Sequence, residues 1–113
     1  MFDCLFCRII NKELPSQIVL ENDQALVIKD IKPVAPIHLL VIPKTHVDNI
    51  CDSRLLETEI LNSLYASIQE IVRKLKLEES GCRIVSNCGR DAGETVPHLH
   101  FHIIAGRQLD SMG

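Results

Sequence analysis

Hydrophobic residues run together, or alternate with polar ones, in five short segments that predict β-strands. The first two flank the polar turn Asn22-Asp23-Gln24 and predict an antiparallel hairpin. The third ends at Pro43, which has no N–H to donate to a strand ladder. A polar loop over residues 89–93 separates the last two. The five segments are residues 18–21, 25–30, 38–43, 82–87 and 98–104.

A three-four spacing of hydrophobic residues predicts two helices. The first is short, covers residues 6–12 and precedes a turn at Pro15. The second lies within residues 53–76, where Asp52 or Ser53 suits the N-cap position and Glu57 interrupts the spacing near the start. The buried face predicted for this long helix consists of Leu61, Leu64, Ile68, Ile71 and Leu75.

The order of these elements predicts the fold class. Strands come first, one long helix follows and strands return without βαβ alternation, which is typical of an α+β fold. We therefore expect a five-stranded antiparallel sheet with one long and one short helix. No repeat or linker divides the chain, so we expect residues 1–113 to form a single domain. Since a domain of this size buries roughly two-thirds of its unfolded surface, a metal or a partner chain would add useful stability.

Charge and hydropathy argue against two classes of partner. Twelve Lys and Arg against 15 Asp and Glu give a net charge of −3, and neither sign forms a block. A binder of nucleic-acid backbones usually carries a basic stripe. The longest uncharged apolar stretch, residues 34–43, is about half the length that crosses a bilayer. We therefore expect neither nucleic-acid binding nor a membrane span.

Cysteine usage and the first residues indicate the compartment. Residues 1–8 carry an acidic residue where a secretion signal has basic ones, and no small-residue cleavage site follows. Five cysteines, an odd number, favour thiols or metal ligands over a disulfide framework. We expect a cytoplasmic protein in which Cys51, Cys82 and Cys88 are buried or incidental.

Three histidines alternate with hydrophobic residues in the last predicted strand. Because side chains two apart share one face of a strand, His98, His100 and His102 are expected on one side of it. About 6.5 to 7 Å separates such positions, so the rings form a row that can surround a phosphate-sized group. Imidazole is a nucleophile at phosphorus, and a second imidazole can bond a phosphate oxygen or protonate a leaving group. The residues expected to face the core are Leu99, Phe101 and Ile103.

Two plainer interpretations of the histidine row stay open: an exposed polar strand face and a divalent-metal site. Three alternating histidines beside a glycine-containing loop favour the phosphorus chemistry over both.

The segment His98-Leu99-His100-Phe101-His102-Ile103-Ile104 resembles the His-φ-His-φ-His-φ-φ signature of the histidine triad (HIT) superfamily, where φ is hydrophobic. The chain is most similar to the Hint, or protein-kinase-C-inhibitor-like, branch. The similarity extends over nearly the whole chain. Its other segments are Cys4–Ile10, Asp30-Ile31 with Pro33, Ala35–His38, Val41–Lys44 with His46, Asn87, and Ala92–Thr95.

This resemblance implies an assembly and an activity. Members of the family form homodimers whose sheets join into one continuous sheet, which would cover an open sheet edge here. The implied activity is that of a purine nucleotide phosphoramidase. Such an enzyme hydrolyses AMP-linked substrates of the adenosine 5′-phosphoramidate type through a nucleotidyl-histidine intermediate. Two alternatives remain open: a dinucleoside polyphosphate hydrolase, and a nucleotide-binding interaction module with incidental turnover.

The resemblance also implies catalytic roles. His100 takes the position of the nucleophile that attacks the α-phosphate, and His102 faces the phosphate oxygens. His38 helps to position and polarise these histidines. Thr95 matches the hydroxyl that bonds the phosphate or the leaving group, and Gly93 permits close approach of the backbone. The mechanism requires no catalytic metal.

Further positions resemble the nucleotide-binding residues of the family. Asp30 matches a carboxylate that accepts the ribose hydroxyls, although Asp is also a common turn residue. Asn87 matches a position near the phosphate, with strand-end capping as the alternative. Glu94 stands where the Hint branch usually has Gln, and it adds negative charge near an anionic substrate. The positions that resemble the apolar base pocket, each also consistent with ordinary core, are Phe6, Ile9, Ile28, Ile31 and Leu40.

A metal site is implied at the start of the chain. Cys4 and Cys7 have the Cys-x-x-Cys spacing that lets two thiolates hold one tetrahedral zinc. By resemblance to family members that keep this pair, His46 and His98 supply the remaining ligands of a structural zinc site. The alternative is a pair of reduced, metal-free thiols. A thioredoxin-like redox role is disfavoured because no βαβ unit surrounds the pair.

Overall fold

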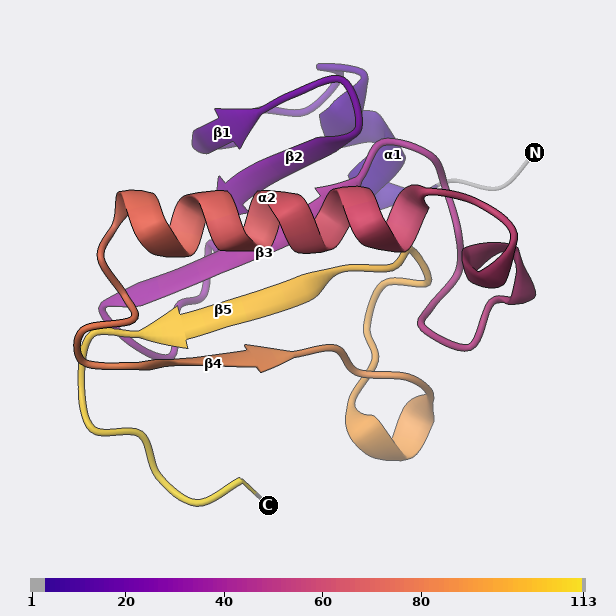
Figure 1. The fold of residues 1–113 in the computed structure, drawn as a ribbon. Coiled ribbons are helices and arrows are strands. Elements are labelled where there is room, and N and C mark those ends of the chain that lie inside the picture. The colour runs from indigo at the N-terminus through magenta and orange to yellow at the C-terminus, as the bar shows by residue number, and fades with distance from the viewer. Residues whose placement is uncertain (1–3, 113) are drawn as a thin grey trace.

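The computed structural model describes residues 4–112, and Figure 1 shows its fold. The helices are α1 (Leu5–Ile10) and α2 (Ile60–Lys74), with two short 3-10 helices, η1 (Ser53–Leu56) and η2 (Arg90–Ala92). The strands are β1 (Ile18–Glu21), β2 (Ala25–Lys29), β3 (Ile37–Pro43), β4 (Cys82–Val85) and β5 (Phe101–Ala105). The predicted α+β class is confirmed.

The five strands form one antiparallel sheet, as predicted. Their order in the sheet, which the sequence did not predict, is β1-β2-β3-β5-β4. β1 and β2 are the predicted hairpin. β5, which comes last in the sequence order of these strands, lies between β3 and β4. In the central pair, Leu40 lies opposite His102 and His38 lies opposite Ile104. His38 and His102 are therefore diagonal neighbours on one face of the sheet.

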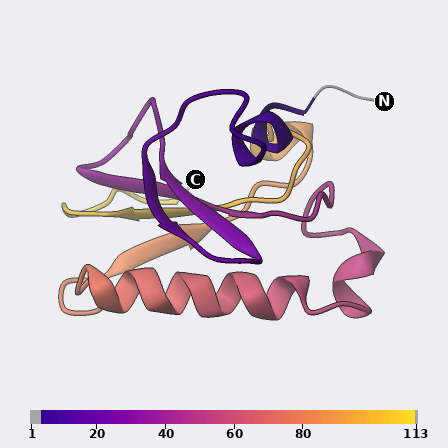
Figure 2. The same cartoon turned by 90° about the horizontal axis from the view of Figure 1, so that it is seen from above.

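Helices cover both faces of the sheet, α2 on one side and α1 on the other (Figure 2). The central strands consequently bury both faces, and β2 and β3 read as nearly continuous hydrophobic runs. The cluster beneath α2 includes Leu39, Val41, Leu64, Ile71 and Ile103. The cluster beneath α1 includes Phe6, Ile9, Leu26, Ile28, Leu40 and Ile42.

The long predicted helix is divided in two. Asp52 caps η1, not α2, because its side chain accepts from the N–H of Arg54. Glu57, which interrupts the hydrophobic spacing, lies in the gap between η1 and α2. The prediction that Leu61 and Leu75 are buried is wrong, since their side chains are 39% and 38% exposed. Leu61 lies in the first turn of α2, and Leu75 comes directly after its last turn. The positions confirmed as buried are Leu64, Ile68 and Ile71.

The histidine strand is shorter than predicted, since β5 begins at Phe101 rather than at His98. Before that point the chain pairs differently, and the N–H of Leu99 donates to the carbonyl of Val47 at 2.8 Å. The alternation of faces holds nevertheless. Leu99 and Ile103 are buried in the cluster beneath α2, and Phe101 packs against it.

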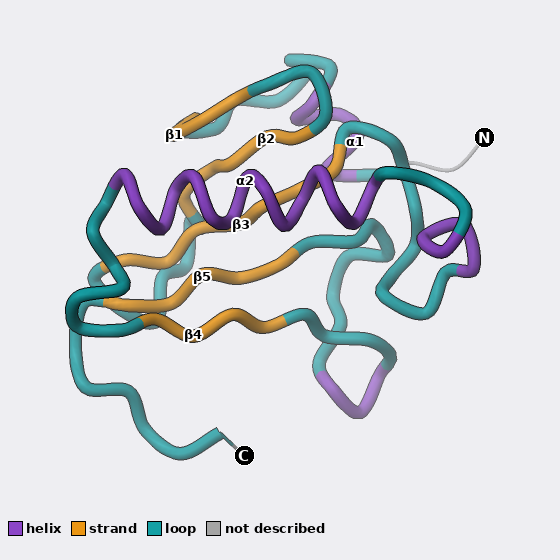
Figure 3. Tube along the Cα trace, viewed as in Figure 1, coloured by secondary structure: helices purple, strands orange, loops and turns teal. Residues whose placement is uncertain are grey.

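The segment after β5 runs back along the sheet as a loop (Figure 3). Arg107 donates to the carbonyl of Val34 at 2.9 Å. Arg83 in β4 donates to the carbonyl of Asp110 at 2.9 Å. Hydrogen bonds from these two arginines therefore hold this segment against the rest of the fold. Within residues 4–112, no helix is long and apolar enough to cross a membrane.

Candidate functional site

His38 and His102 are joined by a hydrogen bond across the two central strands. Nε2 of His38 lies 2.9 Å from Nδ1 of His102. Nδ1 of His38 accepts from the N–H of Val34 at 3.1 Å, so the neutral ring carries its proton on Nε2 and donates it to His102. His102 then carries its own proton on Nε2. Burial, followed by the neighbouring His100 and His38, lowers the pKa of His102 to about 4, so this ring is neutral at pH 7.

His100 has the opposite arrangement of protons. Its Nδ1 lies 2.8 Å from the carbonyl oxygen of His98. A carbonyl only accepts, so in the neutral ring Nδ1 carries the proton and Nε2 keeps a free lone pair. The ring is buried, with its centroid 4.9 Å from that of Phe6 and 5.1 Å from that of His102. The lone pair of His100 and the proton of His102 thus belong to adjacent rings.

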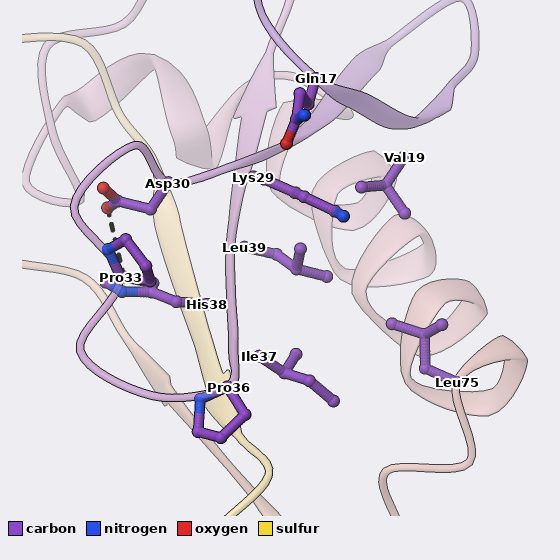
Figure 4. A pocket seen from close by; sticks show the side chains of 10 residues that line it. All are labelled: Gln17, Val19, Lys29, Asp30, Pro33, Pro36, Ile37, His38, Leu39 and Leu75. Atoms are coloured by element: carbon purple, nitrogen blue, oxygen red, sulfur yellow. Dashed lines mark ion pairs between the residues drawn. The ribbon is translucent and has the colours of Figure 1, made fainter.

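Asp30 follows β2 and faces His38 from the start of the next loop. Its Oδ2 lies 3.3 Å from Nε2 of His38 (Figure 4). Its Oδ1 accepts from the N–H of Lys32 at 2.8 Å, which is the turn role that the sequence left as an alternative. The two residues border a pocket of about 400 Å³ that reaches along the sheet to Val19 and Leu75.

The structure unites four of the five residues that resemble a base pocket. Phe6, Ile9, Ile28 and Leu40 are buried together where α1 packs on the sheet. Ile31 is not part of this cluster: it is 91% exposed, in the bend after β2. The chain turns outward at Ile31 to reach β3, so this residue lies apart from the other four, and its place in a base pocket stays a prediction.

The candidate phosphate loop joins β4 to the histidines. Asn87 is half-buried and Thr95 is exposed. Gly93 ends η2 with φ +82, a left-handed conformation that favours glycine. The side chain of Glu94 is held within the loop. Its Oε1 accepts a hydrogen bond from the N–H of Gly89 at 2.6 Å and so closes the loop. Glu94 thus has a local structural role in closing this loop.

A second cluster joins the N-terminal cysteines to two histidines. Nδ1 of His98 lies 3.3 Å from Sγ of Cys4 and 3.5 Å from Sγ of Cys7. Nδ1 of His46 lies 3.4 Å from Sγ of Cys7 and 3.0 Å from Nδ1 of His98. All four atoms lie within 4.8 Å of one another. The structure therefore unites all four residues of the predicted metal site.

The outer nitrogens of both rings fix the direction of their lone pairs. Nε2 of His98 donates to the carbonyl of Pro43 at 2.9 Å, and Nε2 of His46 donates to Oδ1 of Asp48 at 3.0 Å. In the neutral rings both Nδ1 atoms then carry lone pairs, and these two atoms lie 3.0 Å apart. Two nitrogen lone pairs and two sulfurs are the donor set that a tetrahedral zinc takes, and the outer hydrogen bonds are the usual support for such ligands. The sequence missed Asp48, although its place two residues after His46 was a usable signal.

The electrostatics of this cluster also fit a cation. Burial lowers the pKa of His98 to about 4, so its ring is neutral and able to bind a metal. Burial, followed by the nearby Cys4, raises the pKa of Cys7 to about 11 in the metal-free chain. A bound cation would offset the cost of a thiolate in this position.

Comparison with known proteins decides the family. The HIT domain matches residues 11–109 of the chain. This chain belongs to the HIT domain family. A 13.2 kDa HIT-like protein from Azospirillum brasilense is 46% identical over 110 residues, which cover 96% of this chain and 89% of the relative.

Solved structures of HIT proteins superpose closely on this one. A histidine triad protein from Clostridium difficile has a TM-score of 0.92 at 41% identity, covering 100% of this chain and 98% of that one. A structure described as a HIT family hydrolase from Clostridium thermocellum has a TM-score of 0.90 at 38% identity, covering 99% and 97%. The matched HIT domain contains every histidine of the site but begins after Cys4 and Cys7. The cysteine half of the second cluster therefore lies outside it.

The HIT chain contains one further pair of residues that its sequence did not indicate. Sγ of Cys51 lies 3.4 Å from Sγ of Cys88. Cys51 and Cys82 are exposed and Cys88 is half-buried, so of the two expectations, buried or incidental, burial is wrong for these three cysteines. The contact joins two loops that are 37 residues apart, and no local spacing signals such a pair.

Proposed function

We propose that this HIT protein hydrolyses AMP-linked substrates of the adenosine 5′-phosphoramidate type through a nucleotidyl intermediate on His100. The observation that carries the proposal is the hydrogen bond from Nδ1 of His100 to the carbonyl of His98. It leaves Nε2 with the lone pair that an attack on phosphorus requires. The neutral His102 beside it offers an N–H to a phosphate oxygen.

In the proposed first step, Nε2 of His100 attacks the α-phosphorus and the bond from phosphorus to the leaving nitrogen breaks. The departing nitrogen takes a proton from solvent and leaves as the amine, and the water that attacks in the second step returns a proton to solvent. Thr95 is our candidate for bonding the phosphate or this leaving group. In the second step, water attacks phosphorus, the bond to His100 breaks and AMP is released. His38 keeps the proton of His102 on the nitrogen that faces the phosphate. Side chains supply every step, so the proposed mechanism calls for no catalytic metal.

We place the nucleotide by the resemblance of this chain to the HIT family. Asp30 accepts the ribose hydroxyls. The phosphate lies by Asn87 and by the backbone at Gly93 and Glu94. The base lies against the apolar residues between α1 and the sheet. A relative of similar fold supports nucleotide binding by its name, a hypothetical histidine triad nucleotide-binding protein from Sulfolobus tokodaii, with a TM-score of 0.77 at 37% identity, covering 95% of this chain and 71% of that one. We place the protein in the cytoplasm.

We further propose that Cys4, Cys7, His46 and His98 hold a structural zinc ion. The four ligand atoms and their outer hydrogen bonds support this assignment. The ion would link α1 to the segment after β3 and to the segment before β5. In a small domain, such a link adds stability that the core alone supplies only in part.

We also propose a homodimer in which the sheet continues from one chain into the next. β4 pairs only with β5 and is an edge of the sheet. A groove of about 470 Å³ beside it has almost wholly apolar walls, with Leu61 and Tyr65 from α2 and Ile84 from β4. These three side chains are exposed in the single chain. A second copy would cover both the strand edge and the groove.

The decisive experiment compares three substrates with one trapping assay. Turnover is measured with adenosine 5′-phosphoramidate, a diadenosine polyphosphate and lysyl adenylate, and radiolabelled nucleotide is trapped on the protein by acid quenching. We expect fastest release of AMP from the phosphoramidate and a label on His100. Faster cleavage of the polyphosphate would favour the alternative hydrolase. Tight binding of AMP without turnover or label would favour a binding module.

A further inference from the structure

Two thiols outside the Cys/His cluster lie side by side on neighbouring loops. Sγ of Cys51 and Sγ of Cys88 are 3.4 Å apart, and either atom can be the hydrogen donor. A disulfide requires a separation of about 2.05 Å, so the bond needs an approach of only about 1.4 Å. Cys51 is exposed, which gives a soluble oxidant access to the pair.

We propose that Cys51 and Cys88 form a reversible disulfide when the protein meets a peroxide. The bond would tie the loop that carries Asn87 and Thr95 to the segment that follows His46. This proposal rests on the geometry of the two thiols and is independent of the hydrolysis proposed above.

Each cysteine is held in place by its own turn. The N–H of Cys51 donates to Oδ1 of Asn49 at 2.9 Å, and the N–H of Asp52 donates to the carbonyl of Asn49 at 3.1 Å. Cys88 precedes Gly89, whose N–H donates to Glu94 at 2.6 Å. Because both turns are closed by hydrogen bonds of their own, the sulfurs are placed before any bond joins them. Little chain entropy remains to be lost when the disulfide forms.

The surroundings set the order in which the two sulfurs react. The hydrogen bond with Cys51 raises the pKa of Cys88, and burial and the negative charge of Glu94 raise it further. The raised pKa disfavours the thiolate form of Cys88, and Cys51 is the more exposed of the two sulfurs, so we assign the first attack on peroxide to Cys51. A thiolate, rather than a thiol, is the nucleophile towards peroxide.

The chemistry balances with hydrogen peroxide as the only oxidant. The thiolate of Cys51 attacks one peroxide oxygen, the O–O bond breaks, hydroxide leaves and Cys51 becomes a sulfenic acid. The sulfur of Cys88 then attacks the sulfur of Cys51, and the S–O bond breaks. The hydroxyl group leaves with the proton of Cys88 as water. Two electrons pass from the thiols to the peroxide, and a small-molecule thiol reverses the reaction by exchange.

The chain offers a matched control. Cys82 is also exposed, but in the part of the chain that the structure describes no second sulfur lies beside it. Cys4 and Cys7 belong to the proposed zinc site, so loading with zinc would shield them. The informative set is therefore the wild type, Cys51→Ser, Cys88→Ser and Cys82→Ser, each loaded with zinc.

The test treats each protein with an equimolar amount of hydrogen peroxide and maps its peptides by mass spectrometry without reduction. We expect the wild type to lose two of its five thiols, to show one Cys51–Cys88 crosslink and to recover both thiols with dithiothreitol. Cys82→Ser should behave in the same way. Cys88→Ser should stop at a sulfenic acid on Cys51, and Cys51→Ser should keep Cys88 as a thiol.

Hydrogen exchange measures whether the bond holds the loop. Amides of residues 86–95 should exchange at least about threefold more slowly in the oxidised wild type, with no such change in peroxide-treated Cys88→Ser. The proposal is overturned if both cysteines stay reduced while other thiols oxidise, if no crosslink forms, or if the crosslink leaves loop exchange unchanged. None of these readouts involves a nucleotide, so they stand apart from the fate of the proposed hydrolase.

Discussion

His98 and His100 are connected by a hydrogen bond of 2.8 Å from the ring of the second to the main-chain carbonyl of the first. The ring of His98 lies at the same time among the cysteines, with Nδ1 3.3 Å from Sγ of Cys4. One residue therefore serves both clusters, through its backbone in one and its side chain in the other. Whatever fixes the ring of His98 also fixes the carbonyl that orients His100.

Replacing His100 should abolish turnover while the fold remains. We expect His100→Ala or His100→Gly to release AMP from adenosine 5′-phosphoramidate about 10⁴-fold more slowly than the wild type, because the lone pair that attacks phosphorus is gone. Steady-state kinetics measures the loss. Circular dichroism and sedimentation should show an unchanged fold and assembly. Near-normal turnover in a folded variant would contradict the mechanism.

Removing the metal ligands should remove one zinc and lower stability. Elemental analysis should find about one zinc per wild-type chain, and none in the double variant Cys4→Ser with Cys7→Ser. If zinc is present at about 1,000 times its Kd, chelation should lower the free energy of unfolding by about 4 kcal/mol. Urea unfolding with and without chelator measures this difference. Zinc that persists in the double variant would reject these ligands, and Cys82→Ser is the control that should keep its zinc.

The buried His102 predicts a loss of stability in mild acid. Its pKa is lowered to about 4 in the folded chain, against the usual 6.5 in an unfolded one. Between these values the unfolded chain binds a proton there and the folded chain does not, so stability falls as pH drops from 6.5 towards 4. The contribution is complete above pH 6.5.

The variant His102→Gln isolates this effect from the other histidines. Urea unfolding of zinc-loaded protein from pH 4.5 to 7 should show that the wild type takes up about one more proton on unfolding than the variant does. Equal slopes of stability against pH in the two proteins would show that His102 is not the group responsible.

A charge in the groove between α2 and β4 should separate the proposed dimer. Leu61→Arg places a cation among apolar side chains that a second copy would cover, so it should yield a monomer. Analytical ultracentrifugation of the wild type and the variant measures the difference. Leu56→Arg is the control, since Leu56 is 92% exposed and does not line the groove. A wild type that sediments as a monomer at all concentrations would end the proposal.

Most of the fold follows from local patterns. The hairpin of β1 and β2, the termination of β3 at Pro43 and the central part of α2 all agree with hydrophobic spacing. The errors lie where tertiary contacts override that spacing. Leu99 bonds to Val47 instead of extending β5, and the helical segment breaks near Glu57. The spacing of neighbouring residues does not predict a hydrogen bond between segments that are far apart in the sequence.

The candidate site was predictable where residues alternate or recur at short spacing. Such spacing singled out the histidine row and the Cys4-Cys7 pair, and resemblance added His38 and His46. The contact of Cys51 with Cys88 and the outward position of Ile31 depend on how loops cross in space. The proton positions on the rings were likewise beyond the sequence, because the carbonyls and amides of distant segments fix them.

The position of β5 in the sheet has a consequence for how the protein comes into being. β5 pairs with β3 on one side and β4 on the other, yet it is formed by residues 101–105 of 113. Until those residues leave the ribosome, β3 has an open edge, β4 has no strand to join and His38 has no partner imidazole. A chain without these residues therefore cannot form the hydrogen bond between His38 and His102, and we expect the long connection from β3 to β5 to close late in folding.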